Sequence, residues 1–244
     1  MAEELSDQEF PKLSHPPLRE ALIDVRLRDE LPVAVISQFR APADFPLSKP
    51  MKLGQFQFKL EPDKPSQAQV VSEGFWGHRL EKADGSEVLQ VRTNGLTYSI
   101  LQNYPGWDVL KKSTQSVWQN FLGLSGSIPV SRLAVRYINA ITIPAGADYD
   151  EYLTTGPKVP KSVPPIVSGF MQRVVVPFER DAATAVITQA MEGTSTAVLD
   201  IDIFADCVLE GSSPDVWSRL DRLRTIADRI FFSSLTEKVI ASYQ

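Results

Sequence analysis

Leu22-Ile-Asp-Val-Arg-Leu-Arg28 has a counterpart in the second half of the chain, Leu133-Ala-Val-Arg-Tyr-Ile-Asn139. Both stretches have the strand-like alternation of a half-buried β-strand, and in both an Arg follows a Val. Each is followed by a short helical segment, a series of strands with tight turns, and a helix that starts at a proline and carries an early tryptophan (Trp107, Trp217). The chain therefore predicts two similar units.

These patterns predict an α+β protein made of two similar β-α-β(3-4)-α repeats. We expect antiparallel strands in one sheet or two, with helices packed on one side. The predicted organisation is a flexible N-terminus over residues 1–14, a first repeat over 15–126 and a second repeat over 127–244. The order of elements resembles the topology of TATA-binding-protein-like folds, in which two such units form one curved antiparallel sheet.

Local signals place several element boundaries. The apolar spacing predicts a helix from Trp107 to Leu122, closed by Gly123. A second helix is expected from Pro214 to about Tyr243, with Ser213 as its N-cap and a bend near Phe231-Phe232. The alternation in residues 55–61 predicts a strand, and the proline-rich segment 41–50 is expected to end the short helical stretch before it.

Composition narrows the class of protein. The chain has 244 residues, 43% of them hydrophobic, and a formal net charge of -5. It contains no apolar run near the roughly 18 residues that cross a membrane, its N-terminus lacks a secretory pattern, and its single cysteine, Cys207, excludes an internal disulfide. We therefore expect a cytoplasmic protein. The acidic balance, without a cluster of Lys and Arg, counts against nucleic acid as the partner.

The candidate binding residues come from the two matching strands: Arg26, Arg132, Arg136, Tyr137 and Asn139. A guanidinium group binds carboxylates and phosphates through two parallel hydrogen bonds, so these arginines are candidates for a recognition surface. The structural alternative is that the arginines pair with Asp24 or Glu20 and join the two halves.

Signs of catalysis are sparse. Asp200 and Asp202 share one face of a strand, as carboxylates of two-metal hydrolases and nucleases do, but the same spacing is typical of a solvent-exposed face opposite Leu199, Ile201 and Ile203. His15 and His78 are the only histidines, too few for a recognisable zinc site. The sequence has no phosphate-binding glycine loop and no Gly-x-Ser-x-Gly nucleophile motif. We expect no cofactor, no metal and no catalytic residue.

Several motifs resemble those of a sporadically distributed bacterial family of uncharacterised proteins. They are the Pro16-Pro17-Leu18-Arg19-Glu20-Ala21 stretch, Tyr104-Pro-Gly-Trp107, the strand from Arg132 to Ile141 with its Arg-Tyr-Ile-Asn core, and the C-terminal stretch from Phe231 to Tyr243. Together they span nearly the whole chain. The resemblance implies a bacterial origin and supplies no activity.

The leading hypothesis is a non-enzymatic binding or assembly protein, acting in a mobile or defence-linked bacterial operon. It would use a sheet face or the C-terminal helix to hold a protein partner or a small ligand. Outer strands of a sheet are usually paired or covered, so a homodimer or hetero-complex joined by edge strands or C-terminal helices is also expected. The alternatives are a metal-dependent hydrolase or nuclease using Asp200 and Asp202, and a nucleic-acid-binding module.

Overall fold

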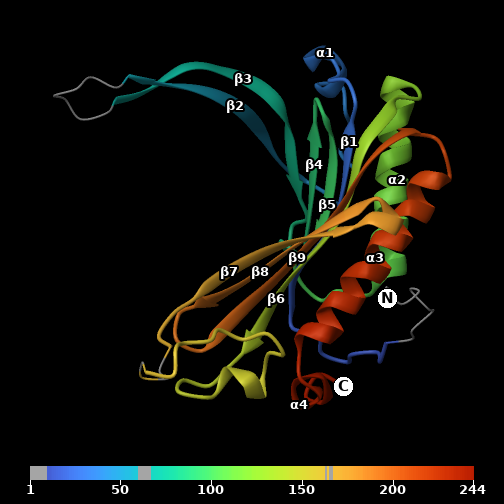
Figure 1. Cartoon of the computed structure of the whole chain (residues 1–244). Helices are drawn as coiled ribbons and strands as arrows, with labels where there is room; N and C mark the ends of the chain where they lie inside the picture. The colour runs from blue at the N-terminus through green and yellow to red at the C-terminus, as the bar shows by residue number, and fades with distance from the viewer. Residues whose placement is uncertain (1–9, 60–66, 163, 165–166) are drawn as a thin grey trace. The chain divides into compact units, whose positions relative to one another are not determined.

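The computed structural model describes residues 10–59, 67–162, 164 and 167–244. In this part of the chain nine strands form one antiparallel sheet, and helices pack against it (Figure 1). The order of the strands in the sheet is β2 (Leu47–Lys59), β3 (Gln67–Glu81), β4 (Glu87–Arg92), β5 (Gly95–Ile100), β1 (Leu18–Leu27), β6 (Pro129–Thr142), β9 (Thr196–Glu210), β8 (Ala183–Glu192) and β7 (Met171–Phe178). The predicted α+β class is confirmed, and both halves contribute strands to the same sheet. The predicted flexible terminus lies outside the described residues over 1–9, as do residues 60 and 61 of the predicted 55–61 strand.

The strand order reads the same outward from the central β1–β6 pair. On one side follow β5 and β4, and on the other side follow β9 and β8. A duplicated strand–helix–meander–helix unit would give this order, although the duplication itself stays a prediction.

The chain forms two compact units. Unit 1 comprises residues 1–23, 133–207 and 214–244, and unit 2 comprises residues 24–132 and 208–213. The boundaries fall within β1 (Leu18–Leu27), β6 (Pro129–Thr142) and β9 (Thr196–Glu210), so each of these strands contributes to both units.

Unit 2 contains most of the first half of the chain. Besides the ends of the three shared strands, it consists of α1 (Val33–Ile36), β2 (Leu47–Lys59), β3 (Gln67–Glu81), β4 (Glu87–Arg92), β5 (Gly95–Ile100) and α2 (Trp107–Ser125). The strands from β2 to β5 pair in sequence as an antiparallel meander. The core is formed by buried residues of the strands and of α2: Leu89, Val91, Leu96, Leu110, Trp118 and Phe121.

Two boundaries in unit 2 differ from the prediction. Strand β2 begins at Leu47 and not at residue 55 as predicted, because an edge strand tolerates the missing N–H of Pro50. Helix α2 continues past Gly123 to Ser125 and ends at Gly126, which has the positive φ of 74° that favours glycine. A glycine inside a helix costs only about 1 kcal/mol, which packing of the other residues offsets.

Unit 1 contains the remaining elements. They are the first part of β1, most of β6 and β9, the 3-10 turns η1 (Tyr149–Glu151) and η2 (Glu179–Asp181), β7 (Met171–Phe178), β8 (Ala183–Glu192), α3 (Asp215–Ser234) and α4 (Glu237–Ala241). Residues of α3 and of β9 form the core: Leu199, Ile201, Ile203, Leu220, Leu223 and Ala227 are at most 1% exposed.

The predicted C-terminal helix is two helices in the structure. Leu235 has extended backbone angles and ends α3 just after the predicted bend, and Thr236 precedes α4. Pro214, and not the expected Ser213, is the residue before the first helical position. No helix within the described ranges is long and apolar enough to cross a membrane.

Candidate functional site

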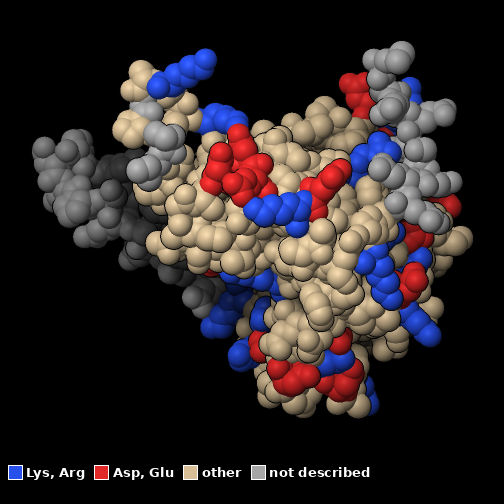
Figure 2. Space-filling model, turned by 90° about the horizontal axis from the view of Figure 1, so that it is seen from below, with Lys and Arg blue, Asp and Glu red and all other residues tan. Residues whose placement is uncertain are grey.

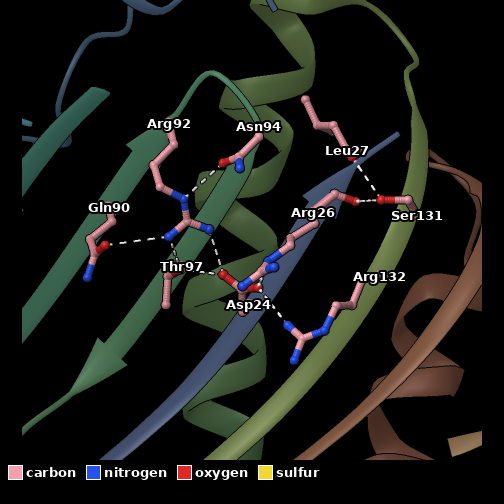
Figure 3. Close-up of polar contacts among 9 residues, drawn as sticks. All are labelled: Asp24, Arg26, Leu27, Gln90, Arg92, Asn94, Thr97, Ser131 and Arg132. Carbon is pink, nitrogen blue, oxygen red and sulfur yellow. Dashed lines mark hydrogen bonds and ion pairs between the residues drawn. The ribbon is translucent and has the colours of Figure 1, made fainter. Parts of the chain in front are cut away.

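The candidate site lies on the face of unit 2 that points away from α2. Figure 3 shows α2 behind the strands and a group of polar side chains in front of them. These side chains come from β1, β4, β5 and β6, and they converge on the carboxylate of Asp24 (Figure 3). We call Asp24, Arg26, Arg92, Thr97 and Arg132 the arginine cluster.

Local structure explains why Arg92 and Thr97 meet. The Thr93-Asn94 turn pairs Arg92 with Gly95 and Gln90 with Thr97, which brings Arg92 and Thr97 to the same face. Gly95 has φ of 142°, and a Cβ there would lie 2.1 Å from the Val25 carbonyl oxygen. Only glycine therefore allows β5 to approach β1 this closely, next to Asp24.

Asp24 accepts hydrogen bonds from four side chains. Its Oδ1 accepts from Arg92 Nη2 and from the Thr97 hydroxyl, both at 2.6 Å. Its Oδ2 accepts from Arg26 Nε at 3.1 Å and from Arg132 Nη1 at 3.3 Å. Both oxygens of one carboxylate are thus used to position three guanidinium groups.

The guanidinium groups of the cluster keep the buried carboxyl of Asp24 ionised. Burial by itself would raise the pKa of Asp24, but the charge of Arg92 and the hydrogen bonds from Thr97 and Arg92 hold that pKa below its ordinary value. Asp24 is therefore ionised at neutral pH. Three guanidinium groups thus meet at one ionised carboxylate.

The arginines differ in how much solvent they reach. The side chain of Arg92 is 8% exposed and that of Arg132 is 18% exposed, whereas the side chain of Arg26 is 51% exposed. Arg92 is also tied to Asn94 Oδ1 at 3.2 Å and to Thr97 Oγ1 at 2.6 Å, and its guanidinium lies 5.4 Å from the Trp76 ring. Arg92 acts as a buried support, and Arg26 faces the solvent.

The five residues predicted from the sequence fall into two groups. Arg26 and Arg132 meet at Asp24 in unit 2, in agreement with the pairing expected from the structural alternative. Arg136, Tyr137 and Asn139 belong to unit 1. Arg92 and Thr97 were not predicted from the sequence, although the Thr93-Asn94 turn between their strands places the two side chains on a common face.

In unit 1 Arg136 binds Asp200 through both carboxylate oxygens. Arg136 Nε donates to Oδ1 at 2.8 Å and Nη2 donates to Oδ2 at 2.6 Å. The hydrogen bond with Asp200 raises the pKa of Arg136, and the charges of Asp200, Asp202 and Glu20 act in the same direction. A metal ion at Asp200 would have to displace this guanidinium. Among the described residues no group of three His, Cys, Asp or Glu side chains could hold a metal.

Tyr137 and Asn139 are buried in unit 1, at 8% and 2% exposure. Asn139 Nδ2 donates to the Leu199 carbonyl oxygen at 3.1 Å. This amide therefore ties β6 to β9, and neither side chain presents the surface that a binding role would need.

The face drawn in Figure 2 has a different charge pattern. Lys and Arg lie beside Asp and Glu there, and neither sign covers the face continuously. The described residues also include exposed ion pairs, such as that of Lys238 with Glu151 at 2.6 Å. Such pairs contribute little to stability.

No protein-family model matches the sequence, and the search of curated proteins found no match. The family resemblance inferred from the motifs thus stays a prediction.

Proposed function

We propose that the protein is a non-enzymatic binding protein that holds a ligand or partner through an anionic group on the open sheet face of unit 2. The observation that carries this proposal is how the guanidinium group of Arg26 is hydrogen-bonded. Its Nε is held by Asp24, while its two terminal nitrogens have no partner among the described residues. A half-exposed guanidinium that is fixed at Nε and has both Nη atoms available is arranged for hydrogen bonds to a carboxylate or phosphate.

The chemistry of the cluster favours binding over catalysis. A general acid or base works best with a pKa near the operating pH. Asp24 has a lowered pKa, and guanidinium groups stay protonated. The cluster therefore contains no group that would exchange a proton near neutral pH, and the exposed guanidinium of Arg26 suits an anion.

Both kinds of partner expected from the sequence fit this chemistry. The anionic group can belong to a small ligand, or to an acidic or phosphorylated side chain of a protein partner. The resemblance to a sporadically distributed bacterial family adds the proposal that this is a bacterial, cytoplasmic protein in a mobile or defence-linked operon. The functions of the neighbouring genes would test that context.

The proposal is tested with inorganic phosphate and with acetate as probes, by titration calorimetry and by thermal unfolding. We expect phosphate to bind the wild type and to raise its unfolding midpoint. Arg26→Gln should weaken this binding about tenfold or more, since a hydrogen bond to a charged group contributes about 1.5–3 kcal/mol.

Arg28→Gln is the matched control. Arg28 lies two positions further along the chain, and its side chain is 55% exposed. This variant removes the same charge without touching the cluster, so its phosphate affinity should equal that of the wild type. No binding of either anion to the wild type, or an equal loss in both variants, would overturn the proposal.

A further inference from the structure

Strand β7 forms one edge of the sheet and is exposed along most of its length. Four of its apolar residues are open to solvent: Met171 is 78% exposed, Val174 51%, Val175 55% and Val176 37%. Edge strands are commonly protected by charges, by prolines or by a covering element. Here the strand itself carries only Arg173 and Pro177 as protection.

The pairing with β8 determines which backbone groups of β7 point outward. The Met191 amide donates to the Phe170 carbonyl oxygen at 3.0 Å, and the same register continues through Met171↔Ala190 to Phe178↔Ala183. Hydrogen-bonded and non-hydrogen-bonded pairs alternate in an antiparallel ladder. The even-numbered residues of β7 therefore bond to β8, and Met171, Arg173 and Val175 direct their N–H and C=O groups away from the sheet.

Pro177 is consistent with this alternation of inward and outward backbone groups. Its position is also an outward one, so the N–H that proline lacks would not have bonded β8. The outer edge thus offers three donors, at Met171, Arg173 and Val175, and four carbonyl acceptors, which include that of Pro177.

We propose that β7 pairs antiparallel with β7 of a second copy of this chain, with Val174 opposite the partner subunit's Val174. In this register Arg173 lies opposite the partner subunit's Val175, and Met171 lies opposite the partner subunit's Pro177. Every outward N–H then faces a carbonyl oxygen, because the proline that lacks a donor is needed only as an acceptor. The two half-exposed Val174 side chains are buried against each other.

The alternative twofold register centred on Arg173 is less favourable. It would place Arg173 opposite the same residue of the second copy, and like charges directly opposite in a sheet repel. The sequence of β7 is therefore self-complementary in one register. This inference concerns unit 1 only and does not depend on the proposed anion site.

Disulfide trapping tests the register. Val174 would occupy a non-hydrogen-bonded pair, in which the Cα atoms are about 4.5 Å apart, within the range that a disulfide spans. In a Cys207→Ser background, Val174→Cys should form a covalent dimer under mild oxidation. Val208→Cys is the matched control: Val208 is an exposed strand valine of β9, at 77% exposure, and should not cross-link. Equal cross-linking of the two variants, or none in either, would overturn the register.

Light scattering tests the dimer itself. At tens of micromolar the wild type should have twice the chain mass of 27.1 kDa. Val175→Pro removes an outward N–H and keeps the ladder to β8, so it should yield a folded monomer, with an unfolding midpoint lowered only by the loss of the dimer contact. A monomeric wild type under these conditions would refute the proposal, and so would a Val175→Pro protein that remains a dimer.

Discussion

Arg92 Nη2 donates to Asp24 Oδ1 at 2.6 Å and thereby joins two residues 68 positions apart in the chain. Both residues are buried, at 6% and 7% exposure. The two charges compensate each other only as a pair, because a single buried charge is costly. This relationship makes Asp24 important for stability as well as for the orientation of Arg26 and Arg132.

Asp24→Asn should lower the free energy of unfolding by about 3 kcal/mol, since it leaves the Arg92 guanidinium buried without its counter-charge. Urea denaturation at pH 7 measures the change. Asp29→Asn is the control, because Asp29 is 76% exposed and its pairing with Arg28 is a surface one. A loss of equal size in both variants would contradict the expected role of burial.

The same pair predicts a dependence on acid pH. The folded state lowers the pKa of Asp24 below its ordinary 3.8, so the stabilisation is complete above the unfolded value and is lost as pH falls through the folded one. The stability difference between the wild type and Asp24→Asn should therefore shrink below about pH 4. A difference that stays constant down to pH 2 would show that the charge is not involved.

Asp228 should behave in the opposite way. Burial raises the pKa of Asp228 from 3.8 to about 6, although Arg224, at 2.7 Å, acts against this change. A raised carboxyl pKa means that the protonated form is preferred in the folded state, so stability falls as pH rises from about 4 to about 6. At pH 8 Asp228→Asn should be more stable than the wild type by up to about 3 kcal/mol.

The measurement for Asp228 is the unfolding free energy of both proteins between pH 4 and pH 8. The two curves should converge at pH 4 and separate through the window up to about 6. Parallel curves would instead indicate a side chain that is ionised in both states. Parallel curves would also mean that the ion pair with Arg224 offsets the free-energy cost of burying the ionised Asp228 carboxylate.

Gly211 and Gly123 form a matched pair of glycines in unit 2 with opposite expected effects. A Cβ at Gly211 would lie 2.8 Å from the Ile128 carbonyl oxygen and 3.1 Å from Trp118 Cζ2, whereas a Cβ at Gly123 would meet nothing within 4 Å. Gly211→Ala should therefore destabilise the protein by about 1–3 kcal/mol. Gly123→Ala, within helix α2, should stabilise it by up to about 1 kcal/mol. Thermal or urea unfolding of both variants measures the two changes. A stabilising Gly211→Ala would show that the packing around Trp118 is looser than in the structure.

Ala182 follows the 3-10 turn η2 in a left-handed conformation, with φ of 39° and ψ of 47°. This conformation costs residues with a Cβ about 1–2 kcal/mol, and glycine avoids most of that cost. Ala182→Gly should raise the unfolding free energy by up to about 1 kcal/mol. The same substitution at the helical Ala241 should lower it, which separates relief of strain from a general effect of glycine.

The sequence determined the fold class through local signals. Alternation predicted the two central strands around Val25 and Val135, and apolar spacing predicted α2 and α3, because strand and helix periods are properties of neighbouring residues. Proline and glycine marked most boundaries. The end of α2 was predicted wrongly. Gly123 and Gly126 can each end a helix, and only the backbone conformation in the folded protein shows that the helix ends at Gly126.

The sequence also identified Arg26, Arg132 and Asp24 as possible partners, because they lie on the two matching strands. Only the tertiary structure decided that both halves share one sheet, that Arg92 and Thr97 complete the arginine cluster, and that β7 is an exposed edge. Strand order and register arise from pairing between distant segments, whose free energy depends on contacts that no local pattern encodes. Arg92 and Asp24, separated along the chain and 2.6 Å apart in the fold, are the clearest instance.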